Sequence, residues 1–168
     1  MDRQRSVARP DVRRPRRVIA VDTNILVYSH RSDSPFHDRA ERVVRQLVEG
    51  GTRWALPWPC IHEFVANVTN ARIYKAPTPL ELALDQARQW LGSPEVRLLA
   101  EEEAYWDALA ALLQSSQVTG AKVHDARIAA LCISHGVSEL WTADRDFNRF
   151  AALRTANPLA EGAPRRSR

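Results

Sequence analysis

A regular alternation of short apolar runs with longer amphipathic stretches is the feature that most constrains the fold of this chain. The first run, Val18-Ile19-Ala20-Val21, is rich in β-branched residues and ends at Asp22. Such a run is typical of a strand that is buried on both faces of a sheet. Similar runs follow, so the sequence predicts five strands, at 18–21, 54–56, 96–99, 139–142 and 153–155.

The stretches between these runs carry apolar residues three and four positions apart, which is the spacing of an amphipathic helix. They predict helices at 36–49, 59–72, 80–91, 103–116 and 123–135. Strands that alternate with helices form parallel sheets with right-handed crossovers. We therefore expect an α/β fold, a three-layer α/β/α sandwich with a central parallel sheet of about five strands. Two consecutive helices between the third and fourth strands interrupt the strict alternation.

Length and charge divide the chain into one domain with a basic segment at each end. A chain of 168 residues is the size of one domain, and 45% hydrophobic with 26% charged residues excludes general disorder, collagen and a disulfide scaffold. Residues 1–17 carry a net charge of +5 and residues 161–168 carry +2, so the total of +4 leaves −3 on 18–160. We expect a flexible N-terminal arm at 1–17, a folded domain at 18–160 and a flexible tail at 161–168.

The lengths of the apolar runs and the spacing of the cysteines indicate the cellular location of the protein. No run approaches the ~18 apolar residues that a membrane span needs, and the arginine-rich start is not followed by the apolar stretch of a signal peptide. Cys60 and Cys132 lie far apart in the sequence and form no CxxC motif. We therefore expect a cytoplasmic protein with no membrane association and two buried, unpaired cysteines.

Four acidic residues stand where the fold alone would favour apolar or neutral side chains. Asp22 ends the first predicted strand, and Asp144 follows the fourth, so both are expected at the carboxyl edge of the sheet, where α/β proteins bind ligands. Glu63 lies one turn into the helix after the second strand. Asp125 lies in the first turn of the helix at 123–135, and it faces inward because the residues three and seven positions later are apolar.

Each of these acids also has an ordinary structural explanation. Asp22 is suited to cap a helix that begins at Thr23, Asp125 to interact with a helix dipole, and Asp144 with Asp146 to form a turn. Together, however, four converging carboxylates would repel one another, and burial would raise their pKa values, unless a cation neutralised them. The nearby basic residues are too few and too close to the helix exteriors for this purpose: Lys122, Arg127 and Arg145.

The donor atoms of these residues indicate a hard divalent cation. Carboxylate oxygens suit Mg²⁺ or Mn²⁺, whereas zinc favours histidine or cysteine. His62 and His124 each directly precede one of the acids, so on a helix they point roughly 100° away from it. A divalent cation held by carboxylates at a strand edge is typical of phosphate chemistry, because it polarises phosphoryl oxygens and lowers the pKa of a bound water.

The ordered set of these acids resembles the PIN-domain ribonucleases, and more closely the VapC-type toxins of prokaryotic toxin-antitoxin pairs. The resemblance covers about residues 18–156 and is carried by four motifs: Val21-Asp22-Thr23-Asn24, Glu63 within a helix, His124-Asp125-Ala126-Arg127-Ile128-Ala129, and Thr142-Ala143-Asp144-Arg145-Asp146-Phe147. It implies that Asp22, Glu63, Asp125 and Asp144 are catalytic acids that bind metal, and that Asp146 is a further ligand. Asn24 and Thr142 would orient Asp22 and the waters.

The resemblance also implies a reaction and partners. The expected activity is Mg²⁺-dependent endonucleolytic hydrolysis of RNA, with Mn²⁺ as a possible substitute, by a toxin that a VapB-like antitoxin silences. A homodimer is the default expectation. An antitoxin helix could bind a groove lined by Trp58, Phe64 and Val68, although Phe64 also suits a core position. The basic arm at 1–17 departs from the family pattern, and two explanations are open: an RNA-binding arm or an over-extended start codon.

Other functions are open at this point. A haloacid-dehalogenase-like phosphatase also places an aspartate after its first strand, but it needs a second aspartate two residues later, where this chain has Asn24. A receiver-like signalling module lacks support, because neither its acidic pair nor its lysine is visible. A PIN nuclease with a housekeeping role in RNA processing and a catalytically inactive binding domain are further alternatives. The sequence holds no P-loop and no GxSxG motif.

Overall fold

The computed structural model describes residues 17–160, which fold around a five-stranded parallel sheet with the strand order β3-β2-β1-β4-β5. All four neighbouring pairs are parallel. The five predicted strands are confirmed, and their bounds are β1 Ile19–Val21, β2 Trp54–Pro57, β3 Val96–Leu99, β4 Glu139–Trp141 and β5 Thr155–Ala156. β5 begins later than predicted because Leu153, expected within it, closes a turn on Phe150 and is buried in the core.

Six α-helices and two short 3-10 helices connect these strands. Their bounds are α1 Thr23–His30, α2 His37–Glu49, α3 Trp58–Val68, α4 Leu80–Leu91, α5 Tyr105–Ser115, η1 Gly120–Lys122, α6 Val123–Ser134 and η2 Arg145–Arg149. α1 lies outside the five ranges that were expected to be helical. It has only eight residues, and three consecutive ones, Ile25, Leu26 and Val27, are buried, so it lacks the spacing of an amphipathic helix.

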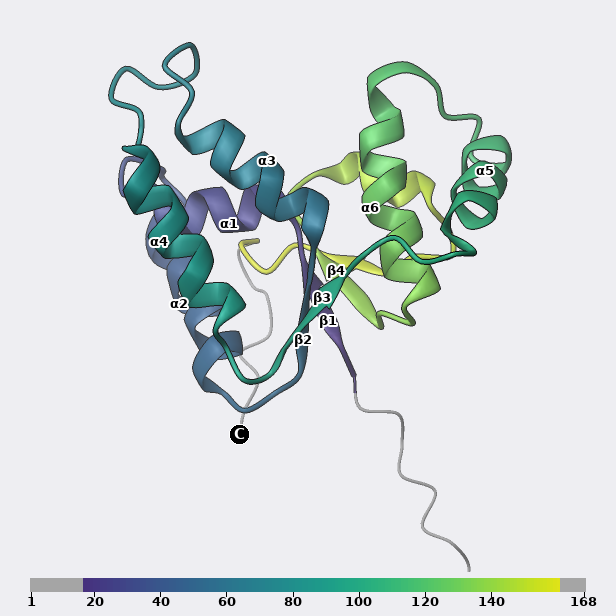
Figure 1. Ribbon diagram of the computed structural model, residues 1–168, viewed down its shortest axis with the longest axis horizontal. Helices are drawn as coiled ribbons and strands as arrows, with labels where there is room; N and C mark the ends of the chain where they lie inside the picture. The colour runs from purple at the N-terminus through teal and green to yellow at the C-terminus, as the bar shows by residue number, and fades with distance from the viewer. Residues whose placement is uncertain (1–16, 161–168) are drawn as a thin grey trace, which may run out of the picture.

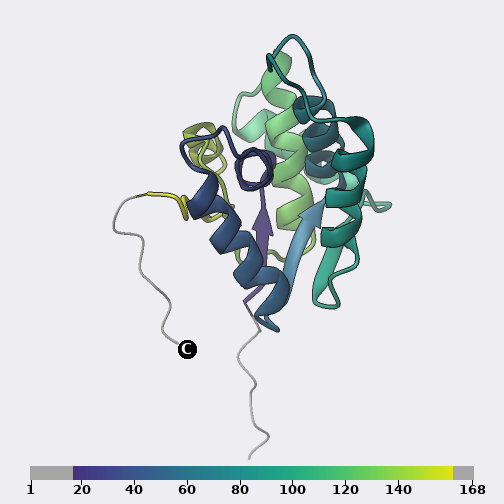
Figure 2. The ribbon, with the colours of Figure 1, turned by 90° about the vertical axis from the view of Figure 1, so that its left-hand side faces the viewer.

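The elements form the expected three-layer α/β/α sandwich. Figure 1 shows α2 and α4 on one side of the sheet and α5 and α6 on the other. In Figure 2 the arrows of β1 and β2 point the same way, as parallel pairing requires. The carboxyl ends of the strands therefore meet at one edge of the sheet, from which α1, α3 and the segment after β4 depart.

The core lies between the sheet and both helical layers. The indole of Trp54 in β2 is fully buried, and its Nε1 donates a hydrogen bond to Ser93 Oγ at 3.2 Å. Phe64 and Val68 of α3 are also fully buried, and the Phe64 ring packs edge-on against Trp90 at 4.7 Å between centroids. The core position that Phe64 also suited is therefore confirmed, and the prediction that Val68 lines an antitoxin groove is wrong, because its side chain is buried in the core.

Further expectations concern the pairing of the cysteines, the presence of membrane-spanning helices and the two ends of the chain. Cys60 and Cys132 are buried and unpaired, as predicted. Within residues 17–160, the structure contains no helix whose length and apolar character would let it span a bilayer. The predicted basic tail at 161–168, and the predicted arm except for Arg17, lie outside the described residues.

Glu139 links three adjacent strands at the amino edge of the sheet. It is the first residue of β4 and is 3% exposed. Its carboxylate pairs with Arg17, which precedes β1, and with Arg154 Nε at 3.0 Å, which precedes β5. It also accepts a hydrogen bond from Trp141 Nε1 at 3.0 Å. This edge is opposite the one where the candidate acids stand, so Glu139 serves stability.

Replacing Glu139 by Gln should destabilise the fold without removing function. The amide keeps the volume but loses two charge-assisted contacts, so we expect the free energy of unfolding to fall by about 1–3 kcal/mol. Urea unfolding followed by tryptophan fluorescence measures this change. A variant as stable as the parent protein would mean that the two arginines contribute nothing measurable to the sheet.

Candidate metal centre and active site

The buried carboxylate of Asp22 is the centre of the site. Asp22 directly follows β1 and is 3% exposed. Its Oδ1 accepts a hydrogen bond from the backbone N–H of Thr23 at 2.7 Å, so Asp22 does cap α1. Its Oδ2 accepts hydrogen bonds from Asn24 Nδ2 and from Thr142 Oγ1, both at 2.6 Å. The residues expected to orient Asp22 therefore both contact it.

Burial raises the pKa of Asp22 to about 6. The hydrogen bonds from Thr142 and from the Thr23 backbone oppose this rise, and the negative charges of Glu63 and Asp144 add to it. Keeping the Asp22 carboxylate ionised near neutral pH therefore costs free energy. A cation close to this edge would reduce that cost.

Three further acids form a cluster beside Asp22. Asp125, in the first turn of α6, and Asp144 and Asp146, after β4, each offer a carboxylate oxygen, and these oxygens lie within 4.8 Å of one another. Asp144 Oδ1 also accepts a hydrogen bond from Asp146 N at 2.8 Å, so this pair forms the turn that its spacing suggested. The hydroxyl of Thr142 accepts from Asp144 N at 3.0 Å while donating to Asp22, so it joins the cluster to the buried acid.

Glu63 reaches the same region from α3 but stays outside this three-acid cluster. Its Oε2 accepts a hydrogen bond from Thr23 Oγ1 at 2.8 Å. Thr23 thus links Asp22 and Glu63, with its backbone on one and its hydroxyl on the other. Sequence reasoning did not single out Thr23, because an uncharged residue inside a short helix gives no signal until α1 and α3 are placed side by side.

Lys122 lies against the three-acid cluster, contrary to the expectation that it is too far out to neutralise the acids. Its Nζ lies 3.3 Å from Asp125 Oδ2 and also pairs with Asp146. This contact lowers the pKa of Asp146 and raises the pKa of Lys122. The separation of three positions between Lys122 and Asp125 at a helix start was a signal for this pair. The contact between Lys122 and Asp146, which lie far apart in the sequence, had no such signal.

A buried thiol completes the surroundings of Asp22. The Cys60 Sγ lies 3.9 Å from Asp22 Oδ1 and donates to it. Burial, reinforced by the charge of Asp22, holds the pKa of this thiol well above its usual range. Cys60 therefore stays protonated and is a weak donor to the carboxylate, and it is neither a metal ligand nor a nucleophile here.

The donor set fits a hard divalent cation. The clustered atoms are all carboxylate oxygens, which Mg²⁺ and Mn²⁺ favour. His62 and His124 are exposed and lie outside the cluster, as expected, and the His62 ring stacks on Trp58 with 5.9 Å between centroids. Acids of this kind at a strand edge can bind a divalent ion and, through it, the oxygens of a phosphate group.

Comparison with known proteins identifies the protein family to which this chain is similar. The family model described as PIN domain matches residues 19–153. The chain is 30% identical to Ribonuclease VapC48 of Mycobacterium tuberculosis over 139 residues, which cover 83% of this chain and 96% of that protein. It is 33% identical to Ribonuclease VapC33 of the same organism over 144 residues, which cover 86% of this chain and all of that protein.

Solved structures share the fold. VapBC2 from Rickettsia felis, bound to a DNA fragment from its promoter, matches with a TM-score of 0.60 and 18% identity, over 83% of this chain and 98% of that one. VapC20 of M. tuberculosis, a toxin that cleaves the sarcin-ricin loop, matches with a TM-score of 0.56 and 17% identity, over 77% and 92%. The PIN match over most of the chain and the near full-length ribonuclease relatives together establish that this protein belongs to the PIN-domain family, among the VapC ribonucleases.

Proposed function

We propose that this protein is a Mg²⁺-dependent endoribonuclease that acts as the toxin of a VapBC-type pair. The single observation that carries the proposal is the group of carboxylates from Asp125, Asp144 and Asp146 beside the buried carboxylate of Asp22. The hydroxyl of Thr142 joins the two parts. Mn²⁺ is expected to substitute for Mg²⁺, because both are hard cations that oxygen ligands satisfy.

Each acid has a distinct part in this proposal. Asp125, Asp144 and Asp146 hold the cation together with Asp22, which Asn24 and Thr142 keep in one orientation. The ion, when bound, would polarise the scissile phosphodiester and lower the pKa of a coordinated water. Hydrolysis would form a bond between the water oxygen and phosphorus and break the bond from phosphorus to the 3′-oxygen, which takes a proton from solvent, so the products would be a 3′-hydroxyl and a 5′-phosphate.

Glu63 is proposed to accept the proton of the attacking water. Its Oε2 is fixed by the Thr23 hydroxyl at 2.8 Å, whereas its Oε1 makes no hydrogen bond within residues 17–160. One oxygen therefore positions the side chain and the other is available to the water. Thr23 is a positioning residue in this scheme, because it acts on the reaction only through Glu63 and Asp22.

The partners follow from the relatives. The R. felis structure is a VapBC complex, and a VapB-like antitoxin encoded nearby is the proposed inhibitor of this protein. The proposed substrate is RNA, and the proposed assembly is a homodimer. The phosphatase alternative is not favoured, because Asn24, which stands where a second aspartate is needed, donates a hydrogen bond to Asp22.

Cleavage of RNA tests the function directly. The purified protein should cut total RNA in Mg²⁺ or Mn²⁺ but not in EDTA, and mapping of the new ends should find 5′-phosphates. Expression alone should arrest growth, and co-expression with the adjacent gene should relieve the arrest. EDTA-insensitive cleavage would exclude the metal mechanism, whereas metal-dependent cleavage without growth arrest would favour a housekeeping nuclease.

Replacing Asp125 by Asn should abolish metal binding and cleavage while preserving the fold. The substitution keeps the volume but removes one charge from the three-acid cluster, so cleavage should fall by orders of magnitude and stability should hold or rise as repulsion is relieved. Calorimetry with Mn²⁺, RNA cleavage and urea unfolding measure the three effects. Asp107→Asn, an exposed change on α5, is the matched control. Cleavage by Asp125→Asn at the parent rate would remove Asp125 from the ligand set.

The metal-free protein should become more stable as the pH falls from about 7 to about 4. The pKa of Asp22 is about 6 in the folded state and 3.8 when unperturbed, so the folded state takes up the proton first. The difference corresponds to about 3 kcal/mol of added stability, complete below the unfolded pKa. Urea unfolding in EDTA at a series of pH values measures it. Asp22→Asn should lack this increase, and an identical pH profile in both proteins would contradict the assignment.

Replacing Lys122 by Met should tighten the binding of divalent ions. The Lys122 ammonium contacts two of the three clustered carboxylates, so it competes with a metal for the same oxygens. Mn²⁺ calorimetry should show several-fold higher affinity in the variant. Lys75→Met removes the other lysine of the chain, which is exposed, and should change nothing. Weaker binding by Lys122→Met would show instead that this lysine supports the metal site.

A further inference from the structure

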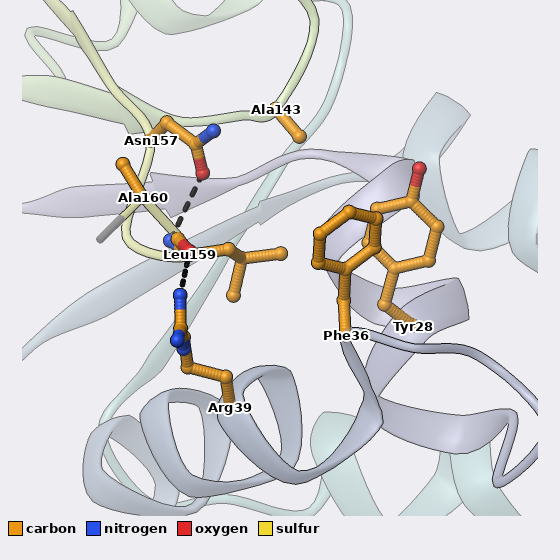
Figure 3. A pocket seen from close by; sticks show the side chains of 7 residues that line it. All are labelled: Tyr28, Phe36, Arg39, Ala143, Asn157, Leu159 and Ala160. Atoms are coloured by element: carbon orange, nitrogen blue, oxygen red, sulfur yellow. Dashed lines mark hydrogen bonds between the residues drawn. The ribbon is translucent and has the colours of Figure 1, made fainter.

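A pocket of about 490 Å³ opens beside the acids and has no part in the chemistry above. Figure 3 shows its walls: the rings of Tyr28 and Phe36 on one side, and Leu159 facing them from the other. Arg39 and Asn157 add polar groups, and Ala143 also lines the pocket. Its lining comes from α1, α2, their connection, and the segments that follow β4 and β5.

The pocket belongs to the same edge of the sheet as the acids. Ala143 stands between Thr142 and Asp144, and its N–H donates to Asn24 Oδ1 at 3.0 Å. Asn157 directly follows β5, and β5 is the parallel neighbour of β4, which leads to Asp144. The pocket and the acids thus meet at adjacent residues of one segment, Ala143 and Asp144. An RNA strand that runs from a phosphate at the acids toward Ala143 would bring a neighbouring nucleotide to this pocket.

The walls suit a flat, apolar ring. Phe36 is 44% exposed although it is a large aromatic residue, and its ring centroid lies 5.2 Å from that of Tyr28. In Figure 3 the Phe36 ring and the Leu159 side chain point toward each other across the pocket. Exposed aromatic rings are the surfaces on which proteins stack the bases of single-stranded nucleic acids.

The polar groups suit the edge of a base and its phosphate. Asn157 Oδ1 accepts from Leu159 N at 2.9 Å, and its Nδ2 donates to no residue within 17–160. Arg39 Nη1 donates to the Leu159 carbonyl at 2.6 Å, which fixes the guanidinium at the pocket and leaves its other N–H groups for an anion. A free amide donor and an arginine beside an aromatic wall together match a nucleotide.

We propose that this pocket binds one unpaired nucleobase of the RNA strand, adjacent to the phosphodiester that is cleaved. The inference rests on the proposed ribonuclease function and adds a determinant of which site is cut. Phe36 stacks on the base, and Asn157 Nδ2 donates to an acceptor on its edge. The pocket thus selects a base by its acceptor position and requires that the base be unpaired.

Binding without cleavage tests the stacking. Fluorescein-labelled ribohexamers of each of the four bases are titrated in EDTA and followed by anisotropy, with the full-length protein. Phe36→Ala should lose about tenfold in affinity, as expected for one stacked base, whereas Phe36→Tyr should retain binding. Leu82→Ala, which changes another exposed apolar residue, 57% exposed and on α4, is the control and should bind like the parent protein. Equal binding by Phe36→Ala and the control would overturn the proposal.

Base preference tests the amide. Asn157→Asp keeps an acceptor for Leu159 N but replaces the free donor with an acceptor, so the base enriched at mapped cleavage sites should change. The added negative charge weakens the binding of every RNA to the same extent, so it does not change the relative frequencies of the four bases at the cleavage sites. An unchanged base frequency at the sites cut by Asn157→Asp would overturn the assignment. If this variant lost only antitoxin binding, that result would also overturn it, because the pocket would then bind a protein. If the parent protein cuts no RNA, the ribonuclease function fails, while the binding titration still reports on the pocket.

Discussion

The burial of one carboxylate organises this molecule. Asp22 ends the central strand β1 with its charge removed from water, which is costly unless hydrogen bonds satisfy it. The Thr23 backbone and the side chains of Asn24 and Thr142 do so. These contacts start α1, join it to the segment after β4 and fix where the remaining acids stand. The negative charge of these neighbouring carboxylates is the reason why a cation would bind at this edge of the sheet.

Much of the fold could be predicted because parallel strands buried on both faces leave a clear pattern. The apolar runs predicted all five strands, and the three- and four-residue spacing predicted five helices. α1 gave no such signal, since its buried residues are consecutive. Periodicity likewise left Phe64 and Val68 open between a groove and the core, and both lie in the core. A helix with neighbours on several sides buries residues that periodicity alone cannot distinguish from an exposed apolar face.

The acids of the site could be predicted because strand ends of a parallel sheet share one edge. Asp125, Asp144 and Asp146 do come together, and Asp22 is joined to them through Thr142. What sequence could not supply were contacts between elements distant in the chain. Lys122 reaches Asp146 across the start of α6, and Thr23 reaches Glu63 between α1 and α3. Such contacts depend on how helices are set against each other, which the spacing of residues does not encode.

The double use of Asp22 matters for anyone who needs an inactive form of this protein. Its side chain caps a helix and anchors a neighbouring loop, so a substitution there alters backbone order together with charge. A loss of toxicity at position 22 would then be ambiguous between lost chemistry and lost protein in the cell. Asp125 caps no helix, and its one described ion pair is with Lys122 on the surface. An inactive reference protein, for growth assays or for trapping a bound partner, is better made there.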